Sequence, residues 1–192
     1  MKSGARALGL ATSYAPGAEL ATVAGVVVRA DRVVDGFVFG ELTVGGSDST
    51  ASLTNLVDRL ERPDVQYVFI AGIAPAQYNI LDLSAFVEHV DRPTIAIAFE
   101  ESNGLESAIK SALDGQQRTK ALERYRTLSE RWPVLVNDNR LFVRAGGIDR
   151  DAVARIVRGF TPSGTRPEPL RVARQAARAM DDWNGPARNK TL

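Results

Sequence analysis

Acidic side chains are the residues of this chain best suited to carry chemistry. The 192-residue sequence contains no cysteine, which excludes disulfides, thiolate zinc sites and cysteine nucleophiles. A catalytic triad would have to use the only histidine, His89, and we interpret it as a surface or helix-end residue because it lies in a helix-like segment ending at Pro93. Catalysis would therefore fall to clustered carboxylates, which can hold a divalent metal that activates water.

Five acidic residues stand where loops are expected to meet strands or helices. Asp48, within GGSDST, precedes a helix and could serve as its N-cap, and Asp82 could cap a later helix in the same way. Asp35 precedes a glycine within a strand pattern and could bond backbone groups at a bulge. Glu100 and Glu101 follow an apolar strand, at a sheet edge where clefts form. Each acid thus has a structural interpretation beside a functional one.

Basic residues gather in the last part of the chain. Residues 150–192 contain nine Arg or Lys against four Asp or Glu. Three of them recur at i, i+3 and i+7, so a helix would align them on one face: Arg171, Arg174 and Arg178. Such a stripe could bind phosphates, extended by Lys2 and Arg6, or it could be a solvated face on which Arg171 pairs with Glu168.

The composition is that of an ordinary globular chain. It is 44% hydrophobic and 24% charged, with a net charge of +1, so nucleic-acid binding would have to use a local patch. No apolar run approaches the ~18 residues of a membrane span, and the start lacks a signal-peptide pattern. We therefore expect one cytoplasmic domain over residues 1–183, without membrane contact, followed by a disordered tail at 184–192.

Hydrophobic periodicity predicts alternating strands and helices. Three successive strands are expected at residues 7–10, 21–28 and 33–44, joined by turns, as in an antiparallel meander. Apolar stripes then predict two helices, around residues 53–60 and 83–90, and continuous apolar runs predict buried strands at 65–70 and 94–99. This order indicates an α/β fold, a mixed sheet flanked by helices.

The second half of the chain is less regular. We expect a loop with a short helix over 102–117 and a helix over 119–131. Two β-rich runs around Asn-Asp-Asn-Arg predict a hairpin at 134–145, and apolar residues predict a helix around 153–160. An extended connection rich in proline leads to a last helix, which Pro169 can start.

Three segments carry a resemblance to a known family: VVDGFVFGELTVGGSDST, GIAPAQYNILDL and TRPEPLRVARQAARA. In this order and spacing they resemble the archaeal endonuclease V-like proteins of the endonuclease dU family. The resemblance runs from about Lys2 to Met180 and implies a ribonuclease H-like fold. It also implies DNA cleavage at deaminated bases, deoxyuridine in particular, with Mg²⁺ or Mn²⁺ as the cofactor of an active enzyme.

The resemblance also shows where this chain departs from its relatives. Where the family's first strand ends in Gly-Ile-Asp-Asp, this chain has Ala11 at the first aspartate, and where the central strand ends in Asp-Gly-Ile it has Ala71. A methyl group cannot bind a metal ion. The resemblance implies that Asp48 is the remaining metal-binding carboxylate, and three further positions match the family: Asp35, Asn79 and Asp82.

Three functions remain open from the sequence. The first is a nucleic-acid-binding protein, with DNA as the expected partner, whose cleavage is weak or lost. The second is an active metal-dependent repair endonuclease in which Glu100 and Glu101 replace the missing ligands. The third is a non-catalytic module that uses the old cleft to bind another partner. In any of these, an exposed edge strand of the meander could pair with a second copy of the chain.

Overall fold

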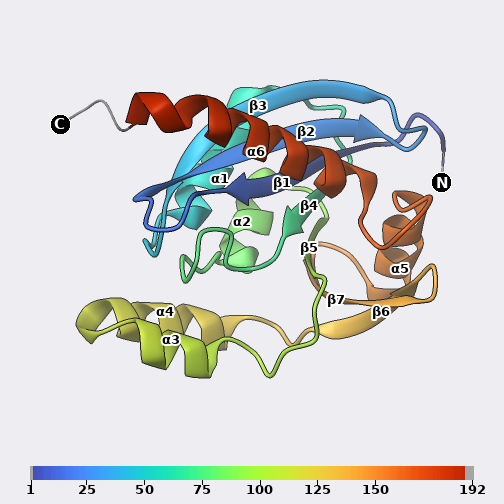
Figure 1. The fold of residues 1–192 in the computed structure, drawn as a ribbon. Helices are drawn as coiled ribbons and strands as arrows, with labels where there is room; N and C mark the ends of the chain where they lie inside the picture. The colour runs from blue at the N-terminus through green and yellow to red at the C-terminus, as the bar shows by residue number, and fades with distance from the viewer. Residues whose placement is uncertain (1, 189–192) are drawn as a thin grey trace.

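The computed structural model describes residues 2–188, with side chains up to Gly185, and folds them around one seven-stranded sheet (Figure 1). The strand order is β3-β2-β1-β4-β5-β7-β6. The strands are β1 Arg6–Ser13, β2 Leu20–Arg29, β3 Val34–Thr43, β4 Tyr67–Ala71, β5 Thr94–Ala98, β6 Trp132–Val136 and β7 Asn139–Gly146. The helices are α1 Ser49–Leu60, α2 Leu83–Val90, α3 Glu106–Ala112, α4 Gly115–Thr127, α5 Arg150–Gly159 and α6 Glu168–Arg188.

The expected mixed sheet is confirmed. β1, β2 and β3 form the antiparallel meander, whereas β4 pairs parallel to β1 and β5 pairs parallel to β4. The apolar run of β4 is buried on both sides, with Val68, Phe69 and Ile70 at 1% exposure or less. Because β1, β4 and β5 run in the same direction, their carboxyl ends meet at one edge of the sheet.

Alternate residues of the central strands face two helical layers. One face packs against α1 and α2, where Leu53 and Phe86 meet Leu8 and Ile70. On the other face Phe69 packs edge-on against Phe160, which follows α5, at 5.5 Å between ring centroids. Helix α6 covers β1 and β2 on this second face and runs nearly along them (Figure 1).

A glycine lets α6 lie directly on β1. A Cβ atom added at Gly9 would stand 2.2 Å from the carbonyl oxygen of Pro169 and 2.8 Å from its Cβ. No other residue type fits this approach without moving the helix. The small residues Ala173 and Ala177 continue the close packing, and both are fully buried.

In the second half of the chain, one expectation is confirmed and two need correction. The helix expected at 119–131 is α4, which begins at Gly115 and ends at Thr127, because Leu128 is extended. The predicted hairpin is confirmed as β6 and β7, with a two-residue turn in which Asn137 and Asp138 have φ of 47° and 62°. Helix α6 continues to Arg188, so the predicted tail is helical over 184–188, and 189–192 lie outside the described residues.

Within residues 2–188, no helix is long and apolar enough to cross a membrane.

Candidate nucleic-acid interface

A cleft of about 480 Å³ lies at the carboxyl ends of the parallel strands. The ends of β1, β4 and β5 form one wall, the segment after β5 forms a second, and the start of α6 with the chain before it forms a third. The residues at the cleft include Ala11, Thr12, Ala71, Gly72, Phe99, Glu100, Ser102, Arg166 and Arg174. Four of the predicted site positions therefore meet here in space: Ala11, Ala71, Glu100 and Arg174.

Ala11 and Ala71 make the cleft wall apolar where the strands end. Ala11 is 3% exposed and packs against Ala173 of α6, and Ala71 belongs to the same apolar cluster. Their methyl groups offer no oxygen to a ligand.

Two guanidinium groups face the cleft. Arg166, in the connection between α5 and α6, lies over the Phe99 ring at 3.7 Å from its centroid, and Arg174 projects from α6. Burial, and then the positive charge of Arg174, lower the pKa of Arg166, although a guanidinium stays protonated at neutral pH. Among residues 2–185, no carboxylate lies within 4.0 Å of either guanidinium. The cleft is therefore cationic.

The two glutamates after β5 differ in position. Glu100 lines the cleft, where it is the only acid among the described residues. Glu101 is exposed and is not part of the lining. The hypothesis that both replace the missing aspartates therefore has only one residue in place.

Asp48 is held by the protein itself. Its carboxylate accepts hydrogen bonds from the Thr43 backbone N–H at 3.1 Å, from the Thr43 hydroxyl at 3.0 Å and from Nδ2 of Asn79 at 2.5 Å. Burial raises the pKa of Asp48, but the bonds from Asn79 and Thr43 outweigh it and lower the pKa. Asp48 occupies the N-cap position of α1, as predicted, but its carboxylate accepts no backbone N–H of the helix. Asp48 is not among the residues lining the cleft.

Asn79 and Asp82 hold helix starts. Asn79 is fully buried; its Oδ1 accepts the Ser49 N–H at 2.9 Å, and its Nδ2 donates to the Thr43 carbonyl at 2.8 Å as well as to Asp48. It thus caps α1 from the loop after β4. Asp82 accepts the Ala85 N–H at 3.0 Å, which confirms its predicted cap of α2.

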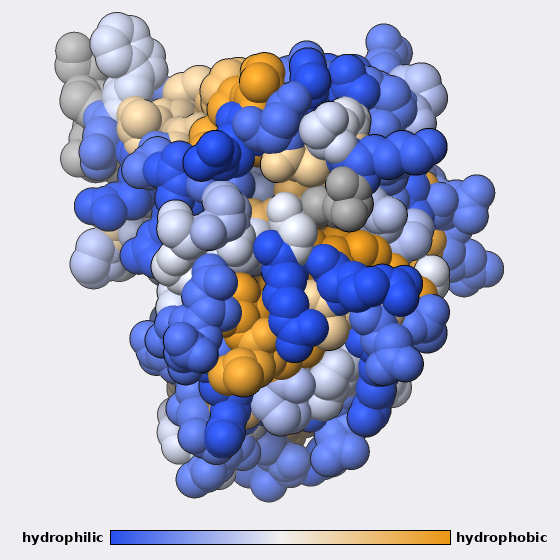
Figure 2. Space-filling view, turned by 90° about the vertical axis from the view of Figure 1, so that its right-hand side faces the viewer, coloured by the Kyte–Doolittle hydropathy of each residue, from blue (hydrophilic) through white to orange (hydrophobic). Residues whose placement is uncertain are grey.

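Asp35 and Arg6 lie at the opposite edge of the sheet, at the amino end of β1. Asp35 occupies the predicted bulge, and its carboxylate binds Nε of Arg6 at 2.6 Å and Arg62 at 3.0 Å; bonds from Arg6 and then Arg62 lower its pKa. Arg6 and Arg62 also pair with Asp64. The amino end of β1 is at the right of Figure 1, and hydrophilic residues cover most of the molecule seen from that side (Figure 2). Lys2 and Arg6 precede or begin β1, so they do not extend a patch at the cleft.

The basic stripe on α6 is only partly available. Arg171 pairs with Glu168 at 2.6 Å, as the structural alternative predicted, and this pairing raises its pKa. Arg178 is exposed but does not line the cleft. Arg174 is the member of the stripe that reaches the cleft, where Arg166, which the sequence did not single out, joins it.

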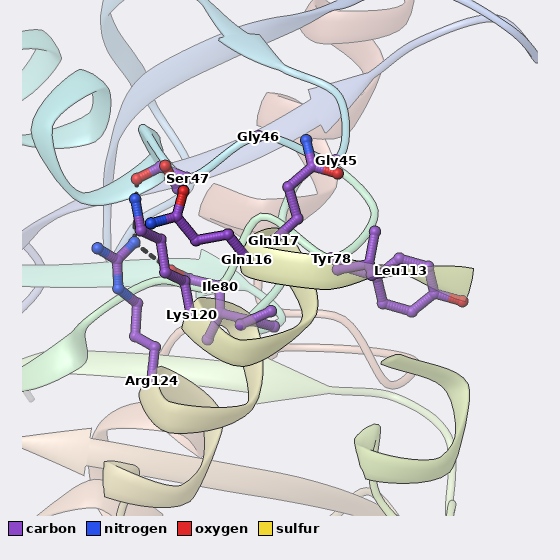
Figure 3. Close-up of a pocket in the computed structure, with 11 residues that line it drawn as sticks. Gly45, Gly46, Ser47, Tyr78, Ile80, Leu113, Gln116, Gln117, Lys120 and Arg124 are labelled. Atoms are coloured by element: carbon purple, nitrogen blue, oxygen red, sulfur yellow. Dashed lines mark hydrogen bonds between the residues drawn. The ribbon is translucent and has the colours of Figure 1, made fainter. Parts of the chain in front are cut away.

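A second, smaller pocket of about 120 Å³ lies between the loop after β3 and α4 (Figure 3). Arg124 donates to the carbonyls of Ser47 at 3.0 Å and Ile80 at 3.3 Å, which ties α4 to the loop. The other polar residues lining this pocket come mainly from α4: Gln116, Gln117 and Lys120. The predicted helix start at residue 119 leaves Gln116 and Gln117 in a loop, so the sequence did not predict this pocket.

The donor set at the cleft does not fit a divalent metal. Mg²⁺ needs well-placed oxygen ligands, and catalytic metals in nucleases are held by several carboxylates. Glu100 is the single acid at the cleft, together with two arginines. The carboxylate oxygens of Asp48 already accept hydrogen bonds from Thr43 and Asn79. Within residues 2–188, no group of three or more His, Cys, Asp or Glu could hold a metal ion.

Comparison with known proteins decides the family. The family described as endonuclease dU matches residues 3–181. The chain belongs to the endonuclease dU family. A UPF0215 protein of Pyrobaculum calidifontis is 28% identical over 92% of this chain and 97% of its own length, and one of Pyrobaculum aerophilum is 32% identical over 81% and 83%. The predicted resemblance is thereby confirmed for this endonuclease dU family member.

Solved structures confirm the fold of this family member. A protein of unknown function from Archaeoglobus fulgidus matches with a TM-score of 0.77 and 22% identity over 92% of this chain and 98% of its own. Human endonuclease V matches with a TM-score of 0.64 and 15% identity over 94% and 86%. Ciona intestinalis endonuclease V, solved with inosine-containing DNA, gives 0.61 and 16% over 93% and 86%. The endonuclease V-like, ribonuclease H-like fold is therefore established.

Proposed function

We propose that this endonuclease dU family member binds nucleic acid at the cleft and has weak or lost metal-dependent cleavage of deaminated, uracil-containing DNA. The observation that carries the proposal is the lining of the cleft. At the carboxyl ends of β1 and β4 stand two alanines, and Arg166 and Arg174 face them. Such a site attracts phosphate groups and repels cations.

Chemistry separates binding from cleavage in this cleft. Hydrolysis of a phosphodiester with a metal needs the ion to activate water and to stabilise the charge that develops. The single carboxylate of Glu100 holds such an ion weakly beside two positive charges. Guanidinium groups, by contrast, bind phosphate oxygens through paired N–H donors and supply no nucleophile. Binding is thus supported more strongly than catalysis.

DNA is the partner that we propose. Ciona intestinalis endonuclease V, which shares the fold, is solved with DNA. We further propose that the protein acts in the cytoplasm. Edge strand β3 leaves Phe37 53% exposed, and we propose that this strand is where a second copy would pair in a homodimer.

An active endonuclease is the second candidate, and one observation favours it. Glu100 faces the cleft, so it could hold Mg²⁺ or Mn²⁺ if substrate phosphates completed the ligand set. On this alternative, Glu100→Gln abolishes nicking, whereas Glu101→Gln, outside the lining, retains it. On our proposal neither substitution changes the low level of cleavage.

The deciding experiment measures binding and cleavage side by side. Purified protein is mixed with labelled uracil-containing and uracil-free DNA, in chelator or with Mg²⁺ or Mn²⁺. Binding that persists in chelator, without nicking in either metal, is the expected result. Robust nicking that chelator abolishes would establish the active enzyme instead, and the absence of both would favour a non-nucleic-acid partner.

A further inference from the structure

Arg166 and Arg174 lack the carboxylate partners that many other arginines of this fold have. Six arginines pair with carboxylates at 3.0 Å or less: Arg6, Arg29, Arg62, Arg118, Arg126 and Arg171. In the part of the chain that the structure describes, Arg166 and Arg174 have no such partner. Their charges stand close enough for Arg174 to disfavour the protonated form of Arg166. An anion between them would relieve that repulsion.

The shape of the site fixes one of the two groups. Arg166 is half-buried, and its Cζ lies over the Phe99 ring at 3.7 Å from the centroid, a cation–π contact that holds the guanidinium at the cleft. This contact supplies no hydrogen-bond acceptor to the guanidinium, so its N–H groups keep their capacity to bind an anion. Arg174 is exposed and approaches from α6, whose position Gly9 fixes against β1. The pair thus combines one half-buried donor held by an aromatic ring and one exposed donor on a helix.

The surrounding wall suits a phosphate rather than a metal. The methyl groups of Ala11 and Ala71 form part of the strand wall, so an anion meets no negative charge there. Glu100 is exposed at the same cleft and can turn toward water. The cleft volume of about 480 Å³ leaves room for a phosphate with its neighbouring sugars.

We propose that Arg166 and Arg174 form a phosphate-binding site that holds a backbone phosphate of a nucleic-acid strand directly, without a metal ion. This inference rests on the proposed function and adds the residues and the chemistry of recognition. Arg166 supplies a fixed pair of N–H donors, and Arg174 closes on the phosphate from the helix. The strand is therefore positioned by phosphate contacts, which carry no base preference of their own.

The test measures binding of the full chain to a short fluorescein-labelled deoxythymidine strand by anisotropy, in chelator. Arg166→Gln and Arg174→Gln should each weaken binding by about tenfold or more, since each removes charge-assisted bonds to the phosphate. Each should also reduce the slope of log affinity against log salt by about 0.7, the release expected for one phosphate contact on a single strand. Arg166→Lys and Arg174→Lys should restore part of the affinity.

Arg178→Gln is the matched control, because Arg178 lies one turn further along α6, is exposed and does not line the cleft. It should bind nearly as the wild type does. Unchanged affinity and salt slope in both cleft variants would overturn the inference while leaving nucleic-acid binding intact. If Arg166→Gln unfolds the protein, as thermal melting would show, the exposed Arg174→Gln still decides the question.

Two further arms identify the source of the phosphate. Strands with and without a terminal 5′-phosphate should bind equally if a backbone phosphate is held, and tighter binding of the phosphorylated strand would overturn that assignment. Inorganic phosphate should compete weakly with the strand and raise the melting temperature of the wild type but not of Arg174→Gln. If the wild type bound phosphate but no strand, the proposed function would fail while the anion site stood.

Discussion

Asn79 shows how one buried amide can hold together the loops beside a site. Its carbonyl oxygen and its NH₂ group reach the start of α1, the end of β3 and the Asp48 carboxylate. Asn79 and Ser49 are both fully buried, so the Ser49 N–H has no water to turn to if the amide is removed. Asn79 and Asp48, which were predicted to match family positions, therefore have a structural role in this chain.

Replacing Asn79 by alanine should lower the free energy of unfolding by about 2–3 kcal/mol, because the Ser49 N–H and the Thr43 carbonyl lose their partner. Urea denaturation followed by circular dichroism measures the change. Gln77→Ala, an exposed change in the same loop, is the control and should cost less than about 0.5 kcal/mol. An equal loss of stability in both variants would contradict the role of the Asn79 hydrogen bonds in holding the loops together.

Asp64 should make stability fall in acid. Hydrogen bonds from Arg62 lower its pKa to about 2, from 3.8. A depressed pKa means that the folded state favours the charged form, so the stabilisation is complete above about pH 4 and is lost as the pH falls toward about 2. Because the pair is partly exposed, its contribution is at most about 1 kcal/mol.

Asp64→Asn should therefore lower the melting temperature at pH 6, with a difference from wild type that shrinks as the pH approaches 2. Thermal melts at several pH values measure this convergence. In an Arg62→Gln background the same substitution should have little effect at any pH, because the main partner is gone. A constant difference at all pH values would contradict the assignment.

At the scale of elements, the position of α6 depends on a single missing side chain. Gly9→Ala would place a methyl group against the backbone of Pro169, and backbone cannot move aside as a flexible side chain can. We expect a loss of about 1–3 kcal/mol in the free energy of unfolding. Gly4→Ala is the control, since a Cβ there meets no atom within 4 Å.

The same substitution links stability to binding. Gly9 lies beneath the start of α6, and Arg174 follows on the same helix. If the helix shifts to admit the methyl group, Gly9→Ala should weaken binding of the deoxythymidine strand more than Gly4→Ala does. Anisotropy at a temperature where both variants remain folded makes the comparison, and equal binding would show that the shift does not reach the cleft.

Elements that hydrophobic patterns mark were predictable, whereas for the polar helix α4 the sequence predicted a helix but not where it begins. Apolar runs predict the meander and the buried strands around Val68 and Ile95. Helix α4 is polar, with few buried residues, and begins at a glycine with φ of 52°, so its first turn has no apolar signal. Its place is set by contacts of Arg124 with distant carbonyls, which periodicity does not encode.

For the whole molecule, the sequence located the cleft better than the groups that fill it. The family resemblance placed Ala11 and Ala71 at strand ends, and the end of the apolar run placed Glu100 and Glu101 beside the cleft; all but Glu101 line it. The sequence could not reveal that Arg6 and Asp35 lie at the other edge, since that depends on strand direction in three dimensions. Arg166 escaped notice because it sits in an irregular connection, and its partner Phe99 is distant in the chain.

The overall charge predicts a shallow salt dependence. The net charge is +1, so no broad field draws DNA to the surface, and binding depends on a few contacts near the cleft. Two to four phosphate contacts give a slope of log affinity against log salt of about −1.5 to −3 for a single strand. Titrations between about 50 and about 200 mM salt measure it. A slope near −10 would reveal a far larger basic surface.

Helix α6, which carries Arg174, also carries an exposed tryptophan near its C-terminal end. Trp183 is 81% exposed, whereas the other tryptophan, Trp132, is half-buried with the Arg150 guanidinium 4.6 Å from its ring centroid. In a Trp132→Phe background the remaining emitter should be open to quenching by iodide. A strand held at Arg166 and Arg174 alone leaves this indole open, as the Arg178→Gln control expects, whereas a strand that continued along α6 would shield it. Quenching of the intrinsic fluorescence therefore distinguishes the two without any attached dye.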